Sequence, residues 1–241
     1  MSSGDFIRKE YWDINYVSGP LVFLRTGNRF ATGSMLNLVL ESGDVRQGQV
    51  LETSETHAVV QVLQGTHGIS VETTSVSLRA DAARVGVSPD MLGQRLNGAG
   101  VPLTGEQTYA VEKEIDINGA AINPVARDKP NDFIETGISA IDGFNTLVRG
   151  QKLPIFSGAG LPANEVADLI VRQSATRNDD EDFVVVFAAM GITERESAFF
   201  LNSFAQGAQS TQVVAVINKA NDPAIERLFT PRCALTIAEY L

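Results

Sequence analysis

One segment of the sequence has the composition and the position of a phosphate-binding loop. It follows a short apolar segment, 152–156, that we expect to be a strand, and it precedes a helix expected over 164–176. Backbone N–H groups at such a strand-to-helix turn, together with the helix dipole, favour an anion. The candidate nucleotide-binding residues are therefore Ser157, Gly158, Ala159, Gly160, Leu161, Pro162, Ala163 and Asn164.

The same loop lacks the side chains that hydrolysis needs. A working P-loop follows G-x-x-x-x-G-K-[ST], in which the Lys reaches the β- and γ-phosphates and the hydroxyl binds Mg²⁺. Here Ala163 stands at the Lys position and Asn164 at the Ser/Thr position. Pro162 replaces the second glycine and has no N–H to donate. We expect no catalysis from this loop. Weak nucleotide contact and a glycine-rich turn without a ligand both stay open.

The residues around the loop alternate between strand and helix patterns. Helical patterns cover 137–147, 164–176 and 193–206, and apolar runs typical of strands cover 152–156, 183–189 and 212–217. The Val-rich run 183–189 has no polar interruption, which indicates a strand buried on both faces. Thr193 and Glu196 fit a capping box that opens the helix after it. This alternation predicts a parallel sheet with crossover helices.

The first third of the chain has a different pattern. Residues 12–78 contain short strand-like runs at 35–40, 49–52, 58–63 and 71–78, separated by turn formers. A small sheet of this kind avoids exposed edges by closing into a barrel.

The predicted fold class is therefore an N-terminal all-β barrel followed by an α/β parallel-sheet nucleotide-binding domain, P-loop NTPase-like and incomplete. We place the barrel at 1–78 and the first part of the α/β domain at 79–241. Gly and Pro between 80 and 135 predict irregular connections with one short helix over 89–96.

Composition disfavours several functions. A formal net charge of -10 argues against nucleic-acid binding and against adsorption to an anionic membrane. The longest apolar run, 183–192, is about half of the ~20 residues that a membrane span needs. His57 and His67 have no ligand spacing, so we expect no metal site. The acidic run 179–182 is expected to be a solvated loop, and the single Cys233 fits a reducing cytoplasm.

Longer motifs carry a family resemblance. They are FIETGISAIDG at 133–143, NTLVRGQKLPIFSGAG at 145–160, FAAMGIT at 187–193 and NDPAIERLFTPRCALTIAEY at 221–240, with weaker stretches at 91–102 and 116–124. With these motifs the chain resembles the non-catalytic B subunit of V/A-type rotary ATPases over essentially its whole length. The barrel region matches more loosely.

The resemblance implies three domains, a barrel, an α/β nucleotide-binding domain and a C-terminal helical domain, and we expect the last to be absent here. It also implies an alternating ring with catalytic A subunits, central and peripheral stalk subunits, and a cytoplasmic location peripheral to a membrane. No nucleotide would bind autonomously. ATP or ADP with Mg²⁺ would sit at the A/B interface of a proton- or sodium-translocating motor, where this subunit is structural and regulatory.

The resemblance also argues against catalysis. In catalytic relatives the strand after the loop helix ends in Gly-Glu-Arg, and its Glu activates water. The matching residues are Gly191, Ile192 and Thr193, and Ile192 cannot act as a base. We expect Glu196 to be a capping residue and Glu194 a solvated one. The family's interface arginine lies downstream of the matched segment, so the following are expected to be surface or salt-bridge residues: Arg149, Arg172, Arg195 and Arg227.

We therefore predict no catalytic residues and no metal ligands. Two alternatives remain: an active P-loop ATPase, which Ala163 and Ile192 contradict, and a truncated fragment or paralogue without autonomous motor function. We expect the early end at Leu241 to leave the parallel sheet unfinished.

Overall fold

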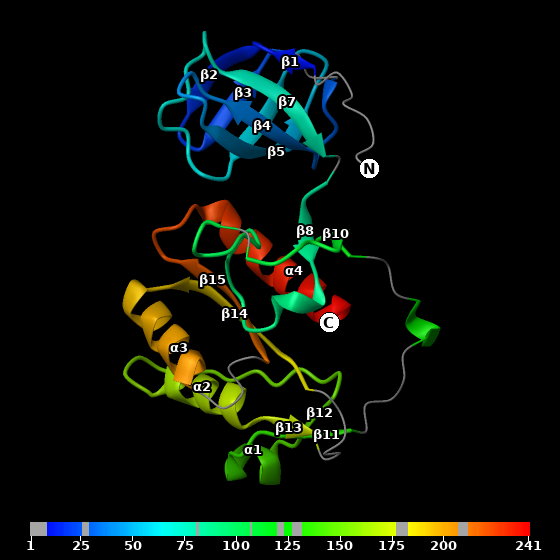
Figure 1. Ribbon diagram of the computed structural model, residues 1–241, viewed down its shortest axis with the longest axis vertical. Coiled ribbons are helices and arrows are strands. Elements are labelled where there is room, and N and C mark those ends of the chain that lie inside the picture. The colour runs from blue at the N-terminus through cyan, green and yellow to red at the C-terminus, as the bar shows by residue number, and fades with distance from the viewer. Residues whose placement is uncertain are drawn as a thin grey trace. The chain divides into compact units, whose positions relative to one another are not determined.

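The computed structural model describes residues 9–25, 29–80, 82–106, 108–119, 123–126, 132–176, 183–206 and 212–241 (Figure 1). The chain forms two compact units. The first comprises 1–85, 116–118 and 223–228, and the second comprises 86–115, 119–222 and 229–241. The predicted boundary at 78/79 stays a prediction, and the acidic run 179–182 lies outside the described residues. No described helix combines the length and apolarity needed to cross a bilayer.

The first unit contains a seven-stranded antiparallel sheet. Its strands are β1 (Glu10–Tyr11), β2 (Ile14–Ser18), β3 (Leu21–Leu24), β4 (Met35–Val39), β5 (Val45–Thr53), β6 (Ala58–Val62) and β7 (Ser75–Ala80). They lie in the order β1-β7-β4-β5-β6-β3-β2. The two end strands, β1 and β2, follow one another in the chain, and Figure 1 shows the strands wrapping around a common interior. The predicted barrel is confirmed.

The alternation of buried and partly exposed residues along the strands explains the core of this barrel. Along β6 every second residue is buried, and the buried ones point to the interior. The interior is apolar and is formed by Ile14, Val22, Leu24, Phe30, Leu36, Leu38, Val50, Ala58, Val60, Val62 and Val76. Strands predicted at 35–40 and 58–63 are confirmed within a residue. The strand predicted from 71 begins only at Ser75, because the Thr74 hydroxyl accepts a bond from the Ser70 N–H and closes a turn there.

The other elements follow along the chain. They are β8 (Arg84–Val87), the 3₁₀ helix η2 (Pro89–Met91), β9 (Arg95–Asn97), β10 (Lys113–Asp116), η3 (Pro124–Ala126), β11 (Phe133–Glu135), α1 (Ser139–Phe144), β12 (Leu147–Val148), α2 (Ala163–Gln173), β13 (Ala175–Thr176), β14 (Val185–Ile192), α3 (Glu194–Gln206), β15 (Val213–Lys219) and α4 (Ala224–Tyr240). Three small sheets result: β14-β15-β9, β12-β11-β13 and β10-β8.

The sheet β14-β15-β9 is parallel throughout, as predicted. β15 is its middle strand, and all its residues except Lys219 are buried. α3 packs on this sheet through aromatic rings: Phe187 of β14 lies 4.7 Å from Phe200 and 5.0 Å from Phe204, measured between ring centroids. The parallel sheet and its crossover helix therefore share one apolar core.

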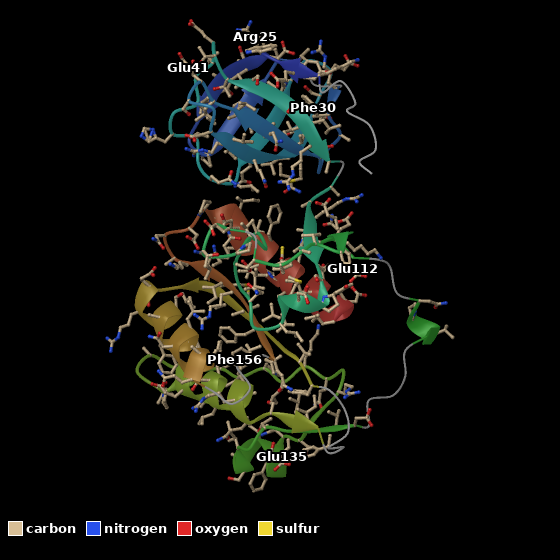
Figure 2. The ribbon with its side chains drawn as sticks, viewed as in Figure 1. Arg25, Phe30, Glu41, Glu112, Glu135 and Phe156 are labelled. Atoms are coloured by element: carbon tan, nitrogen blue, oxygen red, sulfur yellow. The ribbon has the colours of Figure 1, made fainter. Side chains whose placement is uncertain are left out.

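The strand predicted at 152–156 is wrong. These residues have no regular secondary structure, and Phe156 is 92% exposed (Figure 2). A parallel strand exists only when a neighbour accepts and donates its backbone hydrogen bonds. None of the described strands pairs with 152–156, so its apolar sequence is not sufficient to make it a strand.

Two further predictions are corrected. β14 is not buried on both faces: Ala189 is its only buried residue, because among the described strands only β15 pairs with it. The helix predicted over 89–96 is the short η2, and it is followed by β9. Residues Arg95–Asn97 form β9 because they pair with Ala215–Ile217 of β15, an interaction between segments far apart in sequence.

Candidate functional site

The candidate loop, residues 157–164, leads directly into α2. Two of its amide groups bond within the loop: the Leu161 N–H donates to the Gly158 carbonyl at 3.3 Å, and the Ala163 N–H donates to the Leu161 carbonyl at 2.8 Å. Gly160 has a φ of 83°, which favours glycine. With Pro162 lacking an N–H, these bonds reduce the number of donors that the loop can offer to a phosphate.

Asn164 links this loop to the start of α3. Its Nδ2 donates to Glu196 Oε1 at 3.0 Å, between residues 32 positions apart. The other carboxylate oxygen, Glu196 Oε2, accepts from the Thr193 N–H and from the Thr193 hydroxyl, both at 2.8 Å. The Glu196 N–H in turn donates to the Thr193 hydroxyl at 3.3 Å. The predicted capping box is confirmed, and Asn164 extends it to the loop.

This network stabilises the charged form of Glu196. The pKa of its carboxyl lies below the usual value, chiefly because the Thr193 N–H donates to it, with further bonds from the Asn164 amide and the Thr193 hydroxyl. Glu196 is therefore an anion that faces the loop through Asn164. A phosphate placed at the position of the Asn164 amide would meet this negative charge.

Further polar groups gather at the carboxyl ends of β14 and β15, the edge at which open α/β sheets bind ligands. Lys219 Nζ forms an ion pair with Glu194 Oε2 at 2.8 Å. Gly191, with a φ of 69°, lies at an irregularity in the β14–β15 pairing. Its N–H donates to Asn218 Oδ1 at 3.2 Å.

The polar side chains in this region form hydrogen bonds and ion pairs with one another. Ile192, at the position of the catalytic Glu of hydrolytic relatives, packs partly against the sheet core. Glu194 is exposed, as predicted, but it also pairs with Lys219. Arg172 forms the expected kind of surface ion pair, with Asp168 at 2.8 Å. Within the described ranges, no three His, Cys, Asp or Glu residues come close enough to hold a metal ion.

Sequence reasoning missed three polar residues of this edge: Lys219, Asn218 and Asn97. Asn97 ends β9, and its Oδ1 accepts from the N–H groups of Ala99 at 3.0 Å and Val101 at 2.9 Å. The signal was available for the first two, because both directly follow the predicted strand 212–217. A polar residue at the carboxyl end of a parallel strand is a site candidate by position alone.

Two family models match the chain. The nucleotide-binding domain of the ATP synthase alpha/beta family matches residues 137–241, and the beta-barrel domain of the same family matches residues 14–77. The chain belongs to the ATP synthase alpha/beta family. This family's two domain models cover the barrel, the loop 157–164 and the parallel strands β14 and β15.

Within this family the chain matches V/A-type B (beta) subunits over their N-terminal portion. It is 52% identical over 244 residues to the V-type ATP synthase beta chain of Thermus thermophilus, a match that covers 98% of this chain and 51% of the relative. It is 51% identical over 233 residues to the B subunit of the A-type ATP synthase of Methanopyrus kandleri, covering 97% of this chain and 24% of the relative. The predicted resemblance to the B subunit of V/A-type ATPases is confirmed, and the chain spans about half the length of the Thermus relative.

A solved structure supports the fold. The ATPase EscN from the type III secretion system of enteropathogenic E. coli superposes with a TM-score of 0.81 at 23% sequence identity, over 94% of this chain and 52% of EscN. At that identity the likeness concerns the fold only. It supports the arrangement of an N-terminal barrel followed by part of an α/β nucleotide-binding domain.

Proposed function

We propose that this chain serves as a non-catalytic, structural and regulatory B-type subunit of a V/A-type ATP synthase, and that residues 157–164 contribute to a nucleotide site at an interface with a catalytic A subunit. One observation carries the proposal. The side chain at the Mg²⁺-binding position of the loop is Asn164, and its amide is bonded to Glu196. The Asn164 side chain therefore contacts helix α3 of its own chain, where a P-loop hydroxyl would bind the Mg²⁺ of a triphosphate.

The residues present do not fit autonomous binding of Mg²⁺ and ATP. Ala163 supplies no charge for the β- and γ-phosphates, and Asn164 supplies no hydroxyl for Mg²⁺. Ile192 supplies no base. Under the proposal, the ATP or ADP with Mg²⁺ is held by the P-loop of the A subunit, and this chain completes the wall of the site.

The other parts of the proposal come with the subunit type. They are an alternating ring of A and B subunits, contacts with central and peripheral stalk subunits, and a role in ATP synthesis coupled to proton or sodium transport. Association with a membrane would be indirect, through the complex on its cytoplasmic side. The domain division at 78/79 belongs to the same proposal.

The test is assembly with a catalytic A subunit. The chain and the A subunit of a V-type ATP synthase are mixed with ATP and Mg²⁺ and separated by size exclusion, with complex mass and ATP hydrolysis as readouts. We expect a complex of both chains, and no hydrolysis by this chain alone. Hydrolysis by this chain alone would refute a non-catalytic role, and the lack of any complex would favour a chain without autonomous motor function.

A variant sharpens this test. Ala163→Lys with Asn164→Thr restores both missing P-loop side chains in one protein. We expect no hydrolysis from it, because Ile192 remains at the position of the base. If this variant hydrolyses ATP without an A subunit, the loop alone separates the chain from a catalytic subunit, and the inference that Ile192 prevents catalysis is wrong.

A further inference from the structure

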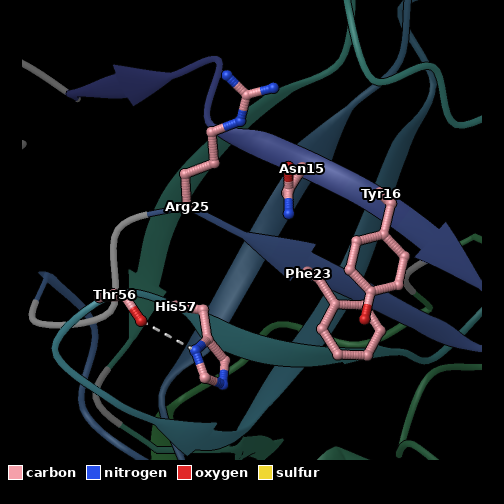
Figure 3. A pocket seen from close by; sticks show the side chains of 6 residues that line it. All are labelled: Asn15, Tyr16, Phe23, Arg25, Thr56 and His57. Carbon is pink, nitrogen blue, oxygen red and sulfur yellow. Dashed lines mark hydrogen bonds between the residues drawn. The ribbon is translucent and has the colours of Figure 1, made fainter.

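The outer face of the barrel carries a groove of about 480 Å³, which we call the barrel groove (Figure 3). It is an open depression across neighbouring strands. β2 and β3 form one side of it, and the turn between β5 and β6 forms the other. Its lining residues are Asn15, Tyr16, Phe23, Arg25, Thr56 and His57. None of them belongs to the loop 157–164 or to the α/β sheet.

An aromatic pair forms the apolar part of the barrel groove. The rings of Tyr16 and Phe23 stack with centroids 4.1 Å apart and planes 9° apart (Figure 3). Tyr16 is nonetheless 47% exposed, and Trp12, just before β2, is 60% exposed. Tyr16 and Arg25, which both line the barrel groove, are of residue types enriched in protein-interface hot spots.

The barrel groove also offers cationic and donor groups. In the part of the chain that the structure describes, Arg25 has no ion-pair partner, whereas Arg29 pairs with Asp13 at 2.8 Å and Arg46 donates to the Gln64 carbonyl at 2.9 Å. The ring of His57 is oriented by a hydrogen bond of 2.8 Å between Nδ1 and the Ser54 hydroxyl. A chain of net charge -10 thus presents an exposed guanidinium in the same groove as an aromatic pair.

We propose that the barrel groove binds a short extended segment of a partner polypeptide that carries a carboxylate beside an aromatic or aliphatic side chain. The carboxylate pairs with Arg25, and the apolar side chain packs on Tyr16. Charge complementarity selects the carboxylate, since Arg25 can form a bidentate pair with it.

One feature favours a polypeptide over a small molecule. The barrel groove is open, whereas small-molecule sites enclose most of their ligand. The barrel groove proposal does not depend on nucleotide binding at residues 157–164.

The test uses a defined probe and the full chain. The probe is the peptide acetyl-VEFEV-amide, and its control is acetyl-VQFQV-amide, which has the same shape and no charge. Trp12 is the single tryptophan, so its fluorescence reports binding near β2. We expect the acidic peptide to bind with saturation and the glutamine peptide to bind about threefold to fivefold more weakly, as is typical of one exposed ion pair.

Variants test whether the peptide binds in the barrel groove. Arg25→Gln should weaken binding of the acidic peptide by the same factor and leave binding of the glutamine peptide unchanged. Tyr16→Ser should weaken binding of both peptides. The matched control is Arg79→Gln, an exposed residue of β7 outside the groove, which should bind like the unmodified chain. Circular dichroism confirms that each variant is folded.

Other outcomes would overturn the proposal. They are equal binding of the two peptides, an equal loss of acidic-peptide binding in Arg25→Gln and Arg79→Gln, or saturable binding of AMP with no fluorescence change on addition of either peptide. The last result would assign the barrel groove to a small aromatic anion. Because no A subunit is present in this assay, its failure is distinct from a failure of the proposed function.

Discussion

The barrel and the parallel sheet are both built from strands rich in apolar residues, Val above all, yet they bury these residues to different degrees. In the barrel, the alternate residues of β6 are completely enclosed. In the parallel sheet, β15 is equally buried, but β14 is half-exposed and Met190 is 50% exposed. This difference in burial follows from the number of strands that pair with each strand. β6 and β15 lie between two strands, whereas β14 pairs with one described strand. Strand sequence determines which residues can be buried, and pairing on both sides determines whether they are.

Truncating one leucine in the barrel and one in the loop of the α/β region tests this dependence on burial most strongly. Leu38 is fully buried in the barrel, whereas Leu161 in the candidate loop is 64% exposed. Leu38→Ala should lower the free energy of unfolding by about 2–5 kcal/mol, because a cavity replaces a packed side chain. Leu161→Ala should change it by less than about 0.5 kcal/mol. Urea denaturation followed by circular dichroism measures both. Equal losses would show that Leu161 is packed in solution and would break the contrast.

Adding a methyl group tests the same contrast from the opposite direction. A Cβ on Gly48 of β5 would lie 2.6 Å from Val60 Cγ1 and 3.2 Å from Leu38 Cδ1. Gly48→Ala should therefore destabilise the barrel by about 1–3 kcal/mol through overpacking. The matched change is Gly158→Ala, where the nearest atom is Leu161 Cδ1 at 3.8 Å. Thermal unfolding of the two variants should differ clearly, and an unaffected Gly48→Ala would mean that the barrel interior is loosely packed.

Local patterns were enough to predict much of the fold. Period-two alternation located the barrel strands, and the spacing of Thr193 and Glu196 located the start of α3. Both signals arise from residues that interact within one strand or one turn. The family resemblance added the identity of the loop and of the subunit type, which spacing alone left open.

Long-range pairing could not be predicted from these patterns. β9 is three residues long within a Gly- and Pro-rich stretch, and it is a strand only because β15 pairs with it. Residues 152–156 show the reverse case, an apolar run that forms no strand. The Asn164–Glu196 bond joins two residues whose local roles the sequence indicates, but their proximity depends on how α2 and α3 pack.

The start of α3 allows a test of local stabilisation in the half-exposed region. Thr193→Ala removes the hydroxyl that accepts from the Glu196 N–H and donates to Glu196 Oε2. It should cost about 1 kcal/mol, the usual value for a lost N-cap. Thr193→Ser keeps the hydroxyl and serves as the control. Amide hydrogen exchange in α3 measures the effect. Equal exchange in the two variants would show that packing on the sheet alone determines the stability of this helix.

The smallest expected effect is a pH dependence that arises in the α/β region. The pKa of Asp142 is lowered because its carboxylate accepts bonds from the Thr136 hydroxyl at 2.7 Å and from the N–H groups of Thr136 and Gly137, both at 3.0 Å. The pKa of Glu196 is lowered by the Thr193 N–H. A carboxyl whose pKa is depressed on folding adds stability above its unfolded pKa, and that stability is lost as the pH falls through the folded pKa.

Unfolding free energies measured from neutral pH downward should therefore fall as these two groups protonate, below the ordinary values of 3.8 for Asp and 4.5 for Glu. Asp142→Asn with Glu196→Gln should be less stable at neutral pH and should lose less stability on acidification, because neither side chain titrates. Both groups border the half-exposed region, so solvent weakens their interactions and the change is small. If the unfolding free energy of the double variant falls with pH as steeply as that of the unmodified chain, other carboxyl groups determine the stability in acid. Polar networks at the ends of β11 and β14 would then orient the helices that follow without adding stability that depends on pH.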